Sequence, residues 1–215
     1  MAESVRTEPL QNRVDPWGNL RSVRSKGTLM GNRGKLHNSQ KAIVRAWRDE
    51  TWIACTLDIQ KWGKRPQMMM PNSYTELFFL DEATAFAAGH RPCAQCRRGR
   101  YNDFQAAWAS TYSTSPKPSA SEMDTRLQAA RLDDQGEKKT WWSTLRDLPD
   151  GAIFTSRGEA FLVWAGRQWR WSFDGYQAAM QPVASDEMVL VLTPEPIVRL
   201  LSVGLSVQVH DSVQY

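Results

Sequence analysis

The chain has 215 residues, of which 41% are hydrophobic and 23% are charged, with a formal net charge of +4. This length and composition are typical of a folded, soluble protein with one large domain or two small ones. No apolar run approaches the ~20 residues that cross a bilayer, and the N-terminus lacks the apolar core of a signal peptide. We therefore expect a cytoplasmic protein with no membrane segment.

The positive charge is concentrated in the first half of the chain. Residues 1–105 hold 17 Lys and Arg against 10 Asp and Glu, whereas residues 106–215 hold 10 against 13. Phosphate contacts supply most non-specific affinity for nucleic acid, so the first half is the better candidate for a surface that binds a polyanion. A solvated basic surface without a ligand explains the same balance.

Short strands are predicted through the first half, after an extended and loose segment at residues 1–26. The glycine-rich segment 27–40 suggests strands joined by tight turns, and residues 41–47 are predicted to return as a strand. Residues 51–59 are rich in β-forming side chains, and residues 74–80 form another candidate strand. This half is predicted to form a small antiparallel sheet.

Helices are predicted in the middle of the chain. Asp81 is a plausible N-cap for a short helix that ends at Gly89, and a second helix is predicted from Cys96 to about residue 110. A segment rich in Ser, Thr and Pro then precedes a third helix at residues 121–134.

The last third is predicted to be a β-meander followed by one helix, which begins with Thr193 as N-cap and stops at Gly204. Its predicted strands cover residues 151–157, 159–165, 167–173 and 188–192.

These patterns predict an α+β fold, with a small antiparallel sheet and helices around a zinc knuckle, followed by a β-rich meander. We divide the chain into a zinc-binding region at 1–110, a linker and helix at 111–135, and a β-rich region at 136–215.

The motif with the clearest chemistry is His90-x-x-Cys93-x-x-Cys96. A Cys-x-x-Cys turn presents two thiolates to one ion, and zinc is the usual metal for sulfur ligands in a reducing compartment. A thioredoxin-type redox pair is the competing reading, but no βαβ pattern precedes the motif. The third interpretation is that the cysteines are ordinary structural residues without metal or redox chemistry.

A closed structural zinc site needs four ligands, so two more must come from elsewhere. Cys55 is one candidate, although a lone strand cysteine is often just a small buried hydrophobe. His90 is the nearest histidine and His37 the next choice, while His210 lies in the C-terminal segment.

The string FFLDEATAFAAGHRPCAQCRR, with TWIACTL before it, resembles part of the N-terminal metal-binding domain of the Ada DNA-repair protein family, over about residues 51–98. In that family a strand, an Ala-rich helix and a Pro-Cys-x-x-Cys knuckle carry zinc-ligating cysteines. The resemblance implies zinc ligands at Cys55, Cys93 and Cys96, with a histidine as the fourth. We choose His90 for this position because it is nearest to Cys93 in the sequence. It also implies a surface that meets DNA.

The chain departs from the family pattern at the position of the family's second cysteine, where it has Ile59. The family's methyl-accepting chemistry needs a nucleophilic thiolate in a four-sulfur site, and a histidine in place of one sulfur would blunt it. We therefore expect a mainly structural zinc in a protein associated with nucleic acid, DNA more than RNA. The candidate phosphate contacts are Arg33, Lys35, Arg91, Arg97, Arg98 and Arg100.

Two other classes of function stay open. The glycine-bracketed GNRGKLH could hold a phosphate, with His37 and Arg33 as candidate catalytic groups of a zinc-dependent, nuclease-like enzyme; an exposed hairpin is the alternative. A nucleobase deaminase is not indicated, because no histidine is followed two residues later by glutamate. The third class is a zinc-stabilised module that binds a protein through its β-rich half.

The ten tryptophans include Trp169 and Trp171, which alternate on one face of a predicted strand. Exposed, the pair would stack bases, and buried, it would form the core of a sheet.

Overall fold

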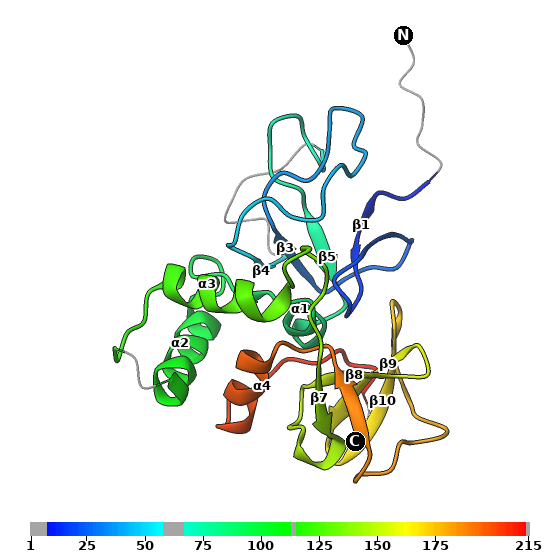
Figure 1. The fold of residues 1–215 in the computed structure, drawn as a ribbon. Helices are drawn as coiled ribbons and strands as arrows, with labels where there is room; N and C mark the ends of the chain where they lie inside the picture. The colour runs from blue at the N-terminus through cyan, green and yellow to red at the C-terminus, as the bar shows by residue number, and fades with distance from the viewer. Residues whose placement is uncertain (1–7, 58–66, 113–114, 214–215) are drawn as a thin grey trace.

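The computed structural model describes residues 8–57, 67–112 and 115–213. Within them the protein has the predicted α+β fold, with two six-stranded sheets and four α-helices (Figure 1). None of the helices in these ranges combines the length and the apolar character needed to cross a membrane.

The N-terminal sheet has the strand order β2-β1-β5-β3-β4-β6. The pairs β1–β5 and β4–β6 are parallel, and the other pairs are antiparallel, so the sheet predicted to be antiparallel is mixed. Its strands are β1 (Gln11–Val14), β2 (Leu20–Ser22), β3 (Leu29–Asn32), β4 (Ile53–Thr56), β5 (Leu77–Phe79) and β6 (Arg91–Pro92).

Two predictions for this half are wrong. The segment expected to be loose contains the β1–β2 hairpin. The returning strand predicted at 41–47 is irregular, with a single bridge between His37 and Ile43. Lys41 has a left-handed backbone, with φ of 61°, which interrupts an extended strand. Most residues of the segment after Lys41 are exposed to solvent and are not paired with a strand of the sheet.

The first helix, α1 (Glu82–Ala87), begins and ends as predicted. The Asp81 side chain caps it by accepting a hydrogen bond from the Thr84 amide. Gly89 follows it with φ of +85°, and a Cβ at this glycine would lie 2.7 Å from Cδ of Arg131. A glycine is therefore needed here both for the left-handed turn and for the close approach of the arginine.

The other helices are α2 (Arg98–Tyr112), α3 (Ala120–Arg131) and α4 (Glu195–Ser202). The predicted N-cap of α4 is wrong by one residue, because Pro194 occupies that position. Thr193 instead accepts a hydrogen bond from the Ile153 amide at 2.9 Å, which ties the start of α4 to the C-terminal sheet.

The C-terminal sheet is antiparallel throughout, with the order β11-β10-β9-β8-β12-β7. Four of its strands were predicted, and the two edge strands were not. The strands are β7 (Trp141–Thr144), β8 (Ile153–Ser156), β9 (Glu159–Trp164), β10 (Arg167–Ser172), β11 (Gly175–Ala178) and β12 (Met188–Val191), with a 3-10 turn at Leu145–Asp147.

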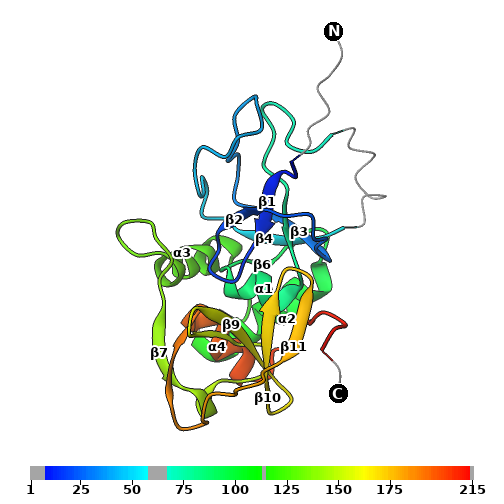
Figure 2. The same ribbon diagram turned by 90° about the vertical axis from the view of Figure 1, so that its right-hand side faces the viewer.

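Helix α1 lies between the two sheets, as both views show (Figures 1 and 2). On one side Ala85 belongs to a small cluster with Leu77 and Phe79 of the N-terminal sheet. On the other side Phe86 joins the largest apolar cluster, which includes Leu162 of β9. The helices of the first half and the C-terminal sheet thus share a core, and the three-part division of the chain stays a prediction.

The segment after α4 runs back to α1. The amide of Gln208 donates to Glu82, and the amide of His210 donates to Asp81, at 3.0 and 2.9 Å. Asp81 also accepts a hydrogen bond from the Tyr176 hydroxyl at 3.2 Å. Burial raises the pKa of Asp81, and these hydrogen bonds oppose that shift. The carboxylates at the start of α1 therefore join the first region of the chain to the C-terminal region.

Candidate metal centre

The parallel pairing of β4 with β6 brings the three cysteines together. Cys55 lies on β4, where Ala54 is in register with Pro92 of β6. The amide of Cys93 donates to the carbonyl of Ala54 at 2.9 Å, which places Cys93 beside the strand that carries Cys55. The turn that follows returns Cys96 to the same place, just before α2 begins.

The three Sγ atoms lie within 4.8 Å of one another. Tetrahedral geometry with Zn–S bonds of about 2.3 Å separates ligand sulfurs by roughly 3.8 Å, so only small side-chain shifts are needed to hold one ion. Three soft sulfur donors also suit zinc by their chemistry. The residues present therefore fit a metal ion, and this triad is called the thiol cluster below.

One thiol of the cluster favours its anionic form. A hydrogen bond from Cys55 lowers the pKa of Cys93 to about 5, and the same bond and burial raise the pKa of Cys55. Burial raises the pKa of Cys96. Without metal the cluster thus holds one thiolate beside two thiols, and an ion bound to all three sulfurs displaces the remaining protons.

His90, the predicted fourth ligand, lies outside the thiol cluster. Its ring is buried against Trp52 and Phe79, with ring centroids 5.2 and 4.6 Å away. Its Nε2 accepts a hydrogen bond from Nε of Arg33 at 3.2 Å, and burial lowers the pKa of the imidazole. His90 is therefore neutral, with its Nε2 lone pair already occupied.

A buried group of cations surrounds Trp52. The guanidinium carbons of Arg33 and Arg131 each lie 4.1 Å from the centre of its ring. Both arginines donate to backbone carbonyls, Arg33 to Gly18 and Arg131 to Gly89, at 2.9 Å each. Burial lowers the pKa of each arginine to about 9, so both stay protonated at neutral pH. Cation–π contacts and carbonyl dipoles thus stabilise the two guanidinium groups, together with the charges of Asp15 near Arg33 and of Asp124 near Arg131.

Lys138 adds a third cation, and its environment gives a testable pH dependence. Its half-buried side chain donates to the Ala87 carbonyl, and burial, followed by Arg33 and Arg131, lowers its pKa from 10.5 to about 7. Because the unfolded chain holds this proton more tightly, the stability contributed by Lys138 falls as pH drops from 10.5 to 7 and is constant below that. We expect the free energy of unfolding to rise from about pH 7 to pH 9, by at most ~1.4 kcal/mol per pH unit from this group.

Denaturant titrations at several pH values would measure that slope. Lys138→Met is expected to reduce it, and Lys139→Met, at an exposed neighbouring position, is the matched control. Equal slopes in the two variants would contradict the assignment.

The other two histidines are also held by hydrogen bonds. His37 is buried, with Nδ1 2.6 Å from the Thr75 hydroxyl and Nε2 3.2 Å from the Met70 carbonyl. His210 pairs with the Ser212 hydroxyl at 2.9 Å. Neither histidine belongs to the thiol cluster, and His37 has no ring nitrogen left to act as a base.

The six predicted phosphate contacts fall into two groups. Arg33, Arg91 and Arg97 are buried, so their guanidinium groups are used inside the protein. Arg100 is half-buried and bonded to Glu82. Of the remaining two, Arg98 is exposed and follows Cys96 by two residues, and Lys35 is half-exposed and donates to Asn72.

Carboxylates that the sequence analysis did not single out explain this burial. Asp124 of α3 forms two hydrogen bonds of 2.7 Å with Arg91, and both side chains are 4% exposed. Glu82 of α1 contacts Arg97 and Arg100, each at 2.9 Å. Ion pairs of the arginines around the Cys-x-x-Cys turn thus connect α1 and α3 to the segment that carries Cys93 and Cys96. Charge pairs this far apart in the sequence leave no local signal.

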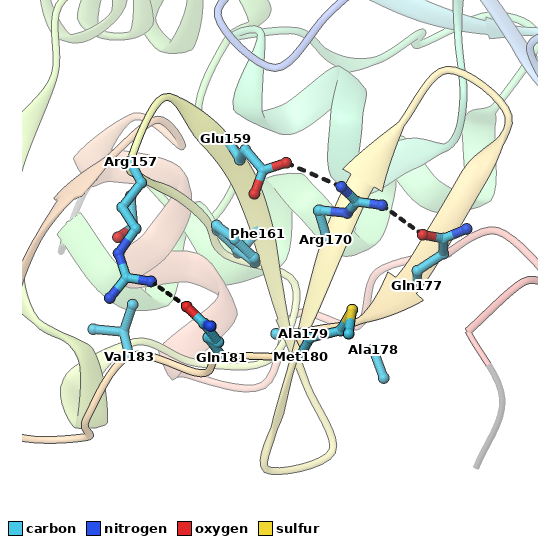
Figure 3. A pocket seen from close by; sticks show the side chains of 11 residues that line it. Arg157, Glu159, Phe161, Arg170, Gln177, Ala178, Ala179, Met180, Gln181 and Val183 are labelled. Atoms are coloured by element: carbon cyan, nitrogen blue, oxygen red, sulfur yellow. Dashed lines mark hydrogen bonds and ion pairs between the residues drawn. The ribbon is translucent and has the colours of Figure 1, made fainter.

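A shallow cleft of about 260 Å³ lies on the C-terminal sheet (Figure 3). Phe161 lines the cleft, and the charged side chains that line the cleft already have hydrogen-bond partners. Arg170 is bonded to Glu159 and Gln177, at 3.1 and 2.6 Å. Trp169 is buried and Trp171 donates to the Thr84 hydroxyl at 3.0 Å, so this tryptophan pair packs inward.

Searches of protein-family models, curated proteins and solved structures found nothing that matches this chain.

Proposed function

We propose that Cys55, Cys93 and Cys96 bind one zinc ion and that the ion has a mainly structural role. The observation that carries the proposal is the approach of all three Sγ atoms to within 4.8 Å, from two segments almost forty residues apart. The ion would join β4 to the start of α2. In a reducing compartment, zinc holds thiolates together where a disulfide does not persist.

Elemental analysis of protein purified without added metal tests this role. We expect about one equivalent of zinc per chain, and a loss of zinc in Cys55→Ser, Cys93→Ser and Cys96→Ser. Gln95→Ser is the matched control, because Gln95 is exposed in the same turn and only its backbone amide reaches Cys93. A folded wild-type protein without metal would refute the proposal.

We further propose that the first half associates with nucleic acid, DNA in preference to RNA. The charge balance of the first half and the resemblance to the Ada domain support this role. Burial of three of the six predicted phosphate contacts moves the expected contacts to cations that solvent reaches. These are the half-exposed Lys35 and six exposed residues, Arg21, Arg24, Lys26, Arg45, Arg48 and Arg98.

A fluorescence titration with labelled DNA at increasing salt tests the association. A surface that neutralises about four phosphates is expected to lose roughly 100-fold in affinity between about 50 and 200 mM salt. Replacing Arg24, Lys26, Arg45 and Arg48 by Gln should weaken binding and flatten the salt dependence. Arg167→Gln, an exposed arginine of the second half, is the control. Affinity that does not depend on salt would exclude this mode of binding.

A further inference from the structure

The thiol cluster supplies three ligands, and the composition of the chain limits what the fourth can be. The sequence holds three cysteines and three histidines, and all six lie in the described residues. The cysteines form the cluster, and none of the histidines belongs to it. A closed structural zinc site usually has four ligands, either four Cys or a combination of Cys and His. The Cys and His residues of this chain therefore cannot complete such a site at the thiol cluster.

We propose that the fourth position at the metal is filled by a thiol from outside this chain. This inference rests on the proposed zinc site and names the ligand class that completes it. Three thiolates make a soft environment in which a fourth sulfur forms the common four-sulfur shell. The donor would be a small cysteine-like thiol or a cysteine of another molecule, which share the same binding atom.

Cys96 is the most accessible cysteine of the cluster. Cys55 and Cys93 are buried, whereas Cys96 is partly exposed and Gln95 beside it is exposed. A donor therefore approaches over the turn between the last two cysteines. Arg98 is exposed and follows Cys96 by two residues, so its positive charge favours an anionic sulfur ligand near this turn.

Backbone amides already support a sulfur-rich site with excess negative charge. The Gln95 amide donates to Sγ of Cys93 at 3.4 Å, and the Thr56 amide donates to the sulfur of Cys96. Hydrogen bonds of this kind stabilise thiolates at a metal. The alternative from within the chain is a carboxylate, and Asp58 is the nearest in sequence, although it lies outside the described residues.

Cobalt-substituted protein, kept reduced with a phosphine so that no thiol is present, provides the test. Addition of 2-mercaptoethanol should raise the sulfur-to-cobalt charge-transfer absorption by about one third, as three thiolate ligands become four. X-ray absorption of the zinc form should change from three sulfurs with one lighter atom to four sulfurs. Ethylene glycol, the matched alcohol, should change neither signal.

The possible outcomes separate this inference from the proposed function. If the protein binds no metal, both the proposed zinc site and the external ligand are refuted. A protein that binds one metal ion but gives an unchanged spectrum with thiol keeps the zinc site and overturns the external ligand. If added thiol changes the spectrum only in the Asp58→Asn variant, the external ligand is also overturned. Asp58 is then the ligand that occupies the fourth position in the wild-type protein.

Discussion

Removing the metal, or replacing Cys93 by serine, is expected to lower the melting temperature by at least about 10 °C. A structural zinc contributes its binding free energy directly to folding, and a change of 1 kcal/mol shifts Tm by about 2–4 °C in a chain of this size. Without the ion, the cysteine segments keep the β4–β6 pairing and the hydrogen bond from Cys55 to Cys93 but lose the metal bonds, and the thiolate of Cys93 is left in a largely buried site. Differential scanning calorimetry with and without a chelator measures the loss.

The chelator must act through the thiol cluster for this explanation to hold. In Cys93→Ser the chelator should have no further effect, whereas in Gln95→Ser it should destabilise as in the wild type. A wild-type Tm that does not respond to chelation would mean that the three thiols hold the site without an ion.

Asp124→Ala is expected to be the most damaging substitution away from the cysteines. It leaves the guanidinium of Arg91 buried without its carboxylate, and breaking a buried pair in this way costs about 3–5 kcal/mol. The same change removes the link between α3 and β6, and the hydrogen bond from Thr51 to Asp124. Equilibrium unfolding in urea gives the free energy.

Asp134→Ala provides the control, since Asp134 is exposed and a change there should stay within about 0.5 kcal/mol. A second variant distinguishes loss of the pair from loss of packing. Arg91→Met combined with Asp124→Leu should recover part of the stability lost in Asp124→Ala, because no buried charge is left unpaired. If the double variant is less stable than Asp124→Ala, the ion pair is not the source of the effect.

Local sequence signals predicted the helices better than the sheets. Asp81 and Gly89 identify α1 because capping and left-handed turns depend on the residues themselves. Strand pairing depends on distant partners, so β7 and β11, at the edges of their sheet, were missed. The parallel pairs of the N-terminal sheet were missed for the same reason.

The thiol cluster was predicted because few residue types bind zinc and the chain has only three cysteines. The roles of the basic residues were harder to foresee. The sequence shows that Arg91 and Arg97 are charged, but not that Asp124 and Glu82 meet them in the interior. His90 is close to Cys93 in the sequence, yet the turn after α1 directs its ring to Trp52 and Arg33.

The return of the C-terminal segment to α1 has a consequence for biosynthesis. Gln208 and His210 are separated by 126 and 129 residues from the carboxylates they contact. At roughly 5–20 residues per second, a ribosome adds these partners about 6–25 s after it has made the helix. Until then Glu82 and Asp81 lack these two backbone donors and have only their partners from the first half, among them Thr84 and Arg97. The first half of the nascent chain therefore completes its packing only when the second half has emerged, and the two halves mature together.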